Sequence, residues 1–536
     1  MFAGRKILFA STLFFVFLFI FVPVIWMFSS TFVVEGKPSL EDNKGLFTQR
    51  NIFFFLNSLL LASLSTLLAS LIGIFLGFLL GKTDIPLKWV LRPLLLLPFI
   101  IPSYIYGLAW ANLLGKTGPL NNMLSYLPFI TSEGISHFIY SPFGAATVLG
   151  LSLFPVIMMV AESSFVGVEA HLEEMGLLLG SRRRTVKEIL FPLALPGIIS
   201  GMIVVFILAL SDFGVPFLLG VKVLPTQIFT EFSVFYNEKM ATALCLPLAL
   251  FTVLIITLER VFLGARPLEG LVRGTRGRTY LYTLGKGKVP YFVACVLIFC
   301  LSVFSPLISL IVDSWSLEAY KRAFSLAKLG IVNTLVFSAV GATLLTLLGL
   351  ILGYFLEKYR LPSTRELGFS LMLLFAVPAT VIGVGLIKLW NRPEVFFQWI
   401  YGTFAIIIIG YIARFSPLSV RFLADGYRQV SSSISEAAEV YGAGWWTLMV
   451  KIFFPLLIPG IVTTWILSFI FCAGELGTTI LIYPPGDETL PITLFTVMAN
   501  SPANVVSAIS VILLVVVLLP LIVFLGLSRR LGRWRY

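Results

Sequence analysis

The sequence predicts an all-α integral membrane protein with twelve transmembrane helices, arranged as two parallel repeats of six helices. Three observations support this fold class: long apolar segments recur along the whole chain, basic residues gather in every second loop, and residues of the two halves match at nearly constant offsets. Of the 536 residues, 58% are apolar and only 12% are charged. A soluble protein of this length needs more polar surface to cover its core.

The predicted spans are apolar segments of about 20 residues or more, the length that crosses the hydrocarbon core of a bilayer. The first span follows Arg5 and Lys6. It is longer than the core of a signal peptide, which has about 7–15 residues, so we expect it to remain as the first helix. The twelve spans cover residues 7–29, 53–81, 89–115, 139–161, 191–220, 240–263, 289–312, 331–356, 367–390, 402–424, 454–482 and 505–527.

The basic residues predict the orientation of these spans. If the N-terminus is cytoplasmic, most of the 38 lysines and arginines fall on the cytoplasmic side, with clusters at 182–184, 260–288 and 529–535. This asymmetry follows the positive-inside rule and predicts that both termini are cytoplasmic. The net charge of +12 then lies where anionic lipid headgroups account for it, and we expect no nucleic-acid partner.

The two halves of the chain repeat each other, which predicts a tandem architecture. An offset of 276 residues separates Asn57 from Asn333 and Pro102 from Pro378. Further matches, at offsets of 276 or 263, are Gly73 with Gly349, Gly77 with Gly353, Gly107 with Gly383, Glu173 with Glu436, 191–193 with 454–456 and 196–198 with 459–461. We predict a first half at 1–263, a cytoplasmic linker at 264–288 and a second half at 289–536. Six spans in each half give both halves the same orientation.

Two pairs of matching glycines predict close helix packing. Gly73 and Gly77 lie four residues apart in the second span, and Gly349 and Gly353 do so in the eighth. Small residues at this spacing let two helix backbones approach each other closely.

Each half also carries a long loop between its fourth and fifth spans, at about 162–190 and 425–453. The second loop contains, in order, Glu436, Ala437, Ala438, Gly442, Ile452 and Pro455. A glutamate early in a short helix is favoured by the helix dipole, alanines keep one face slim, and a glycine lets the helix end in a turn. This spacing resembles the EAA loop of the permease subunits of binding-protein-dependent ABC importers.

The resemblance implies that the two loops are coupling helices that dock into a separate ATPase. The first copy is degenerate: Glu173 is retained, Glu174 and Met175 replace the two alanines, and Gly180 stands one position later than the pattern expects. The residues that the resemblance assigns to ATPase coupling are Glu173, Glu174, Gly180, Glu436, Ala437, Ala438 and Gly442.

The sequence contains no phosphate-binding loop for ATP. Gly81-Lys82-Thr83 and Gly115-Lys116-Thr117 resemble the end of such a loop, but Leu76 and Trp110 occupy the positions of the first glycine that it needs. We therefore predict a transport subunit rather than an enzyme, with no cofactor of its own. The four cysteines and two histidines have no metal-ligand spacing. The resemblance implies two copies of a cytoplasmic ATPase that binds ATP and magnesium, an extracytoplasmic solute-binding protein, and a bacterial-type cytoplasmic (inner) membrane as the location.

Short strings near the fifth span of each half resemble those of the fused permeases of iron(III), thiamine and related importers. They are Leu210-Ser211-Asp212-Phe213-Gly214-Val215-Pro216, Gly474-Glu475-Leu476-Gly477 and Tyr483-Pro484-Pro485-Gly486. Iron(III) is the first substrate that we expect, with thiamine, polyamines and phosphonates as alternatives. The alternative from another class is an ion-coupled secondary transporter with twelve helices. That class commonly places more ionisable groups in its spans and gives no reason for a duplicated loop.

Asp212 and Glu475 match in the two halves, and both lie inside predicted spans. A charge within the membrane is costly and usually faces a bundle interior or water, and a glycine two residues after each acid predicts a locally broken helix. We predict that the pair lines the translocation pathway and favours a cationic solute. The alternative is that the two acids cap helix ends or pair with Lys388 or Arg414.

Overall fold

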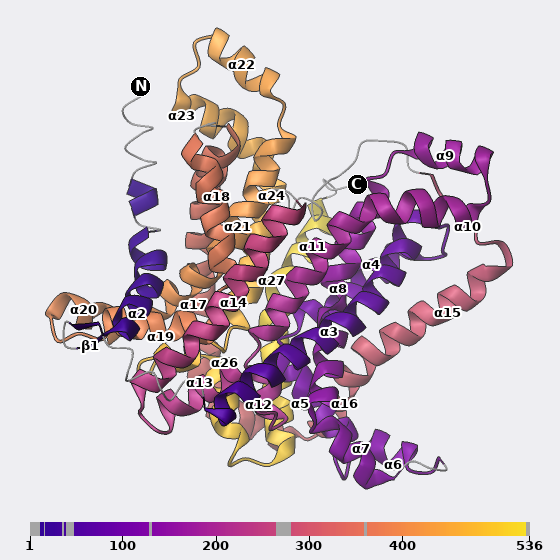
Figure 1. Cartoon of the computed structure of the whole chain (residues 1–536). Helices are drawn as coiled ribbons and strands as arrows, with labels where there is room; N and C mark the ends of the chain where they lie inside the picture. Colours follow the sequence, from indigo (N-terminus) through magenta and orange to yellow (C-terminus); the bar gives the residue numbers. More distant parts are fainter. Residues whose placement is uncertain are drawn as a thin grey trace. The chain divides into compact units, whose positions relative to one another are not determined.

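The computed structural model describes residues 11–14, 17–34, 37–38, 48–127, 131–263, 280–358 and 362–531 (Figure 1). Helices dominate this part of the chain. The strands β1 (Val33–Val34) and β2 (Lys37–Pro38) form one short antiparallel pair. The predicted all-α fold class is therefore confirmed.

The chain forms two compact units. The first unit consists of residues 46–230 and 247–315, and the second unit of residues 1–45, 231–246 and 316–536. Each unit holds most of one predicted half, but the first helix of each half is assigned to the other unit. The predicted boundaries, 1–263, 264–288 and 289–536, concern the sequence repeat, and linker residues 264–279 lie outside the described residues.

The first unit is built around α3 (Gln49–Lys82), α8 (Pro142–Val166) and α11 (Phe191–Leu210), which pack against one another. Its other helices are α4 (Lys88–Ile100), α5 (Ser103–Leu114), α6 (Pro119–Leu124), α7 (Ser132–Ile139), α9 (Ala170–Leu179), α10 (Arg182–Thr185), η3 (Val186–Leu190), α12 (Gly214–Leu218), η5 (Gly285–Gly287), α15 (Lys288–Phe299), η6 (Cys300–Phe304) and α16 (Ser305–Asp313). Both units share α13 (Leu224–Ser233) and α14 (Glu238–Leu263).

The second unit repeats this plan with α17 (Leu317–Lys358), α21 (Ala405–Gln429) and α24 (Phe454–Ala473) at its centre. Its other helices are η1 (Phe17–Phe21), α2 (Val22–Phe32), α18 (Pro362–Ala376), α19 (Ala379–Trp390), α20 (Val395–Tyr401), α22 (Ser432–Val440), α23 (Trp445–Thr447), η7 (Leu448–Phe453), α25 (Thr479–Ile482), α26 (Leu490–Met498) and α27 (Ala503–Leu531).

Eleven of the predicted spans have a counterpart in the described residues. Nine helices are long and apolar enough to cross a membrane, and two bent helix pairs raise the count to eleven if each pair is one span. The span predicted at 7–29 falls partly on residues outside the description, and the apolar helix found there, Ser11–Met27, is shorter than the others. The total of twelve therefore stays a prediction.

The third span of each half is bent, which corrects the expectation of continuous helices at 89–115 and 367–390. The bend between α4 and α5 is 95°, and the bend between α18 and α19 is 106°. Pro102 and Pro378 stand directly before the second helix of each pair. A proline lacks an N–H group and disfavours a helical residue before it, and Ile101 is accordingly extended, with φ −74° and ψ 125°.

The matching glycines lie where helices come closest, as the sequence predicts. A Cβ atom added to Gly73 would come within 2.8 Å of Ile157 Cβ on α8, and one added to Gly349 within 2.6 Å of the backbone oxygen of Ser419 on α21. The α3–α8 and α17–α21 contacts therefore depend on glycine in the same way in both units.

Candidate functional site

Each unit contains a break in the helix that corresponds to its fifth span. In the first unit α11 ends at Leu210 and α12 begins at Gly214. In the second unit α24 ends at Ala473 and α25 begins at Thr479. The predicted local breaks are therefore confirmed, and each break carries one of the two matching acids.

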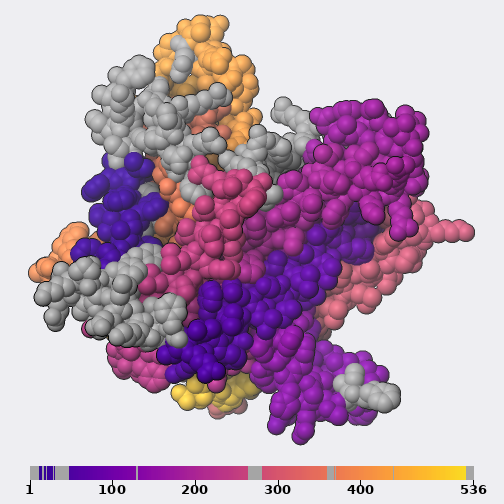
Figure 2. Space-filling view, viewed as in Figure 1, coloured from indigo at the N-terminus to yellow at the C-terminus, as the bar shows by residue number. Residues whose placement is uncertain are grey.

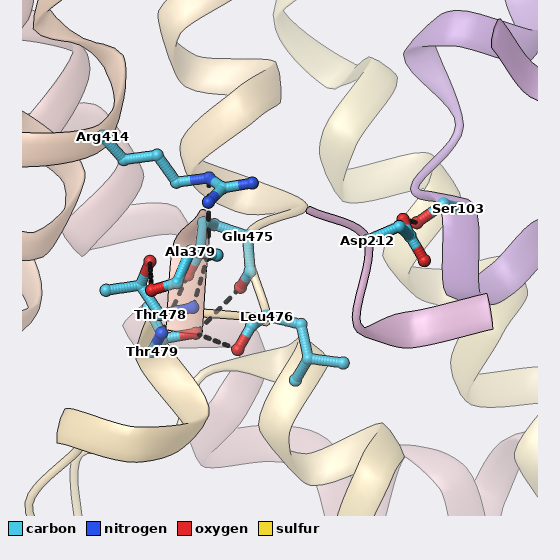
Figure 3. A network of polar contacts seen from close by, with 8 residues as sticks. All are labelled: Ser103, Asp212, Ala379, Arg414, Glu475, Leu476, Thr478 and Thr479. Atoms are coloured by element: carbon cyan, nitrogen blue, oxygen red, sulfur yellow. Dashed lines mark hydrogen bonds and ion pairs between the residues drawn. The ribbon is translucent and has the colours of Figure 1, made fainter. Parts of the chain in front are cut away.

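Asp212 caps the short helix after the break in the first unit. Its Oδ1 atom accepts the backbone N–H of Val215 at 2.9 Å. Its Oδ2 atom accepts the hydroxyl of Ser103, the first residue of α5 (Figure 3). The half-buried carboxylate thus joins the break after α11 to the bend before α5, and a helix N-terminus favours its negative charge.

Glu475 caps the helix after the break in the second unit, and its neighbour Thr478 makes the link to the bent third span (Figure 3). Its two carboxylate oxygens accept the backbone N–H groups of Thr478 at 2.7 Å and Thr479 at 2.9 Å. The hydroxyl of Thr478 donates to the backbone oxygen of Ala379, the first residue of α19, at 3.2 Å. Arg414 Nε lies 3.7 Å from Glu475 Oε1, and the Glu475 side chain is only 3% exposed.

Both acids therefore cap helix ends, as the alternative interpretation of the sequence predicts, and Glu475 also pairs with Arg414. Lys388, the other cation considered from the sequence, instead pairs with Glu238 at 2.8 Å. The caps explain why two broken helices tolerate acids at this position, since the carboxylates accept backbone N–H groups that the breaks expose.

A second repeated arrangement holds the segments that follow the breaks. Asn57 donates to the backbone oxygen of Lys222 at 3.1 Å, and Asn333 donates to that of Glu488 at 3.0 Å. The next residue on each helix, Ser58 or Thr334, accepts the backbone N–H that begins α13 or α26, at 2.8 Å and 2.7 Å. The sequence matched the two asparagines, but only the structure assigns this clamp to them.

The two loops predicted to couple to an ATPase each contain the expected short helix. Helix α9 ends at Leu179 before Gly180, and α22 ends at Val440. Gly442 follows with φ +77°, a conformation that favours glycine. Figure 2 shows both segments at the surface of their own units.

The predicted coupling residues differ in their exposure. Those that are exposed are Glu174, Gly180, Glu436, Ala437 and Gly442, and Ala438 is half-buried. Glu173 is fully buried and forms an ion pair with Lys82, which is also fully buried. The two matching glutamates, Glu173 and Glu436, thus occupy different surroundings.

The helices contain a second pair of matching acids that the sequence analysis left out. Glu162 lies near the end of α8 and Asp425 near the end of α21, and the offset of 263 residues relates them. Glu162 pairs with Arg92, and Asp425 lies 3.4 Å from Arg421. The predicted spans stopped one residue too early to include either acid, although their equal offset was readable from the sequence.

Comparison with known proteins decides the family. The family model of the binding-protein-dependent transport system inner membrane component matches twice, at residues 73–265 and 346–534, which together exceed half of the chain. The chain belongs to this family. The double match confirms the fused repeat, and the family and the apolar helices together make the chain a multi-pass inner membrane transport component. The ion-coupled secondary transporter is accordingly set aside.

Several relatives match the chain over most of its length. A putative ferric transport system permease protein of Haemophilus influenzae is 28% identical, over 87% of this chain and 76% of the relative. A second Haemophilus influenzae relative, named an Fe(3+)-transport system permease protein, is 26% identical, over 84% of this chain and 85% of the relative. A putative 2-aminoethylphosphonate transport system permease protein of Salmonella paratyphi A is 26% identical over 33% of this chain and 66% of its own length.

Proposed function

We propose that this permease moves iron(III) from the exterior into the cytoplasm by alternating access, driven by ATP hydrolysis in a separate subunit. The names of the relatives that match most of the chain favour iron(III). The phosphonate relative matches only one third of the chain, so a phosphonate is a weaker candidate, as are thiamine and a polyamine.

The surface of the two loops supports coupling to an ATPase. Leu178 and Leu179 at the end of α9 are 87% and 84% exposed, and Val440 and Tyr441 at the end of α22 are 86% and 92% exposed. Large apolar side chains grouped on polar loops are typical of a partner surface. Two such loops would hold two ATPase copies, which bind the ATP and magnesium, while an extracytoplasmic binding protein delivers the solute. Both termini would then be cytoplasmic.

In this proposal, Asp212 and Glu475 line the translocation pathway. Each lies where two interrupted helices meet within its unit. Irregular backbone within a membrane is tolerated where it lines a cavity or is buried in protein. A carboxylate at such a place would favour a cation during passage.

The test of coupling uses the exposed leucines of α9. The permease is reconstituted with its ATPase and binding protein, and ATP hydrolysis is measured with binding protein loaded with iron(III), thiamine, putrescine or 2-aminoethylphosphonate. We expect stimulation by iron(III) alone. Leu178→Asp with Leu179→Asp should reduce ATPase binding and abolish the stimulation, as should Glu436→Arg on the other loop, whereas Leu178→Met with Leu179→Met should preserve both. Binding by the aspartate variant at the wild-type level would contradict the docking role.

A further inference from the structure

The described end of the linker, residues 280–288, is joined to the inner end of the α3 segment. The backbone N–H of Tyr282 donates to the backbone oxygen of Lys82 at 2.7 Å, and the N–H of Asp84 donates to the backbone oxygen of Tyr282 at 3.4 Å. The Asp84 carboxylate accepts the N–H of Leu284 at 2.9 Å and pairs with Lys288 at 2.7 Å. The extended backbone at Tyr282 therefore pairs with the backbone at and just after the end of α3, at residues 82–84.

Tyr282 also reaches the first coupling loop. Its hydroxyl donates to Glu173 Oε2 at 2.8 Å, while Lys82 holds Glu173 Oε1. A buried carboxylate is stable only when its oxygens have donors, and here one oxygen has a cation and the other a phenol. Burial and the neighbouring carboxylate raise the pKa of Tyr282, so the phenol keeps the proton that it donates.

The aromatic ring of Tyr282 is buried among side chains of the first unit. Tyr282 is 6% exposed and belongs to a buried cluster with Phe165 of α8 and Val168, which precedes α9. Its ring centroid lies 6.2 Å from that of Phe78 on α3. One linker residue thus contacts α3, α8 and the loop that carries α9.

The second unit uses the matching residues differently. Lys358 stands 276 residues after Lys82, but its ammonium donates to the backbone oxygen of Val430 at 2.7 Å. Glu436, which matches Glu173, is exposed. Of the Glu-Ala-Ala run, the first copy keeps only the glutamate, and that glutamate is the residue that points inward to Lys82 and Tyr282.

We propose that linker residues 280–288 brace the first coupling helix, with Tyr282 as the positioning residue that fixes α9 to α3 through Glu173. The proposal rests on the proposed function of α9 as an ATPase contact. The brace makes the two coupling loops unequal: α9 moves together with α3 as one body, whereas α22 presents its glutamate to the partner. Tyr282 and Lys82 thus act through Glu173 and not by touching the ATPase.

The test compares Tyr282→Phe, which removes only the hydroxyl, with Tyr280→Phe, the same change two residues earlier. In the intact permease, amide hydrogen exchange of residues 170–179 should accelerate about tenfold or more in Tyr282→Phe, the factor that corresponds to a lost hydrogen bond to a charged group. Exchange of residues 432–440 should not change. Asp84→Ala, which loosens the same segment outside the buried cluster, should accelerate residues 170–179 in the same direction.

Coupling is read separately, as ATP hydrolysed per solute imported in proteoliposomes. Tyr282→Phe should raise this ratio while the complex with the ATPase stays intact, and Tyr280→Phe should leave it at the wild-type value. Unchanged exchange of α9 in Tyr282→Phe would overturn the brace, whatever the transport assay gives. Faster exchange with an unchanged ratio would overturn its role in coupling. A wild-type permease that binds no ATPase would overturn the proposed function instead, and the exchange data would still report on the brace.

Discussion

The acids at the two helix breaks carry both a capping role and a proposed transport role, and paired substitutions can separate them. Glu475→Gln and Asp212→Asn remove the negative charge but keep a carbonyl oxygen that accepts a backbone N–H. Glu475→Ala and Asp212→Ala remove the charge and the cap together. Stability should follow the cap, whereas uptake should follow the charge.

The size of the capping effect follows from the hydrogen bonds. Glu475→Ala leaves the buried N–H groups of Thr478 and Thr479 without their acceptor, at about 1–3 kcal/mol each. Asp212→Ala leaves one such group, that of Val215, so its cost should be about 1–3 kcal/mol. Glu475→Gln should cost about half of the corresponding alanine change, because one of its two acceptor oxygens stays. Asp212→Asn should cost little, because its amide oxygen can still accept the N–H of Val215.

The assay combines unfolding in mixed detergent micelles with solute uptake into proteoliposomes at equal amounts of folded protein. The double variant of Asp212→Asn and Glu475→Gln should assemble with the ATPase but lose at least about tenfold in uptake, as expected when a charge that favours the solute is removed. Wild-type uptake in this double variant, together with loss of stability in the alanine variants, would refute the pathway role and leave only capping.

Three further predictions concern packing, the clamps and pH. Gly349→Ala places a Cβ 2.6 Å from a backbone oxygen and should cost about 1–3 kcal/mol of unfolding free energy. The control Gly526→Ala, whose Cβ would meet nothing within 4 Å, should cost none. Equal losses of unfolding free energy in the two variants would contradict the close packing. Asn57→Ala and Asn333→Ala should each lose about 1 kcal/mol in the same micelle assay, and loss in only one would contradict the equivalence of the clamps. The ammonium of Lys288 and the N–H of Leu284 lower the pKa of Asp84 below its usual 3.8, so this contact stabilises the linker above that pH and is lost as the pH falls through the lowered pKa. Amide exchange of Leu284 should accelerate there, and it should do so less in Asp84→Asn.

Much of the architecture could be predicted because the residues that repeat in the two halves, such as glycines, have strong effects on how nearby helices form and pack. The glycines at 73, 77, 349 and 353 indicated the closest helix contacts, and the structure places them there. Among the described residues, the apolar segments located the nine helices that are long and apolar enough to cross a membrane and the two bent helix pairs, because length and composition are the properties that such a helix needs. The loops that contain α9 and α22 were located by the Glu-Ala-Ala spacing, which is complete in the second loop and degenerate in the first.

The rest depends on contacts between residues far apart in the chain. Pro102 and Pro378 were matched, but a proline can begin, kink or end a helix, so the bends of 95° and 106° could not be read from it. The assignment of Glu173 to ATPase contact came from its place in a motif, whereas its burial depends on Lys82 and on Tyr282, 109 residues further along. Local sequence carries no signal for either partner.

Uptake into proteoliposomes that contain the permease, its ATPase and its binding protein, with ATP inside and ionophores that collapse the proton and sodium gradients, tests directly whether ATP drives transport. We expect uptake of iron(III) to continue under these conditions and to stop when ATP is omitted. Uptake that needs an ion gradient and proceeds without ATP would contradict ATP-driven import.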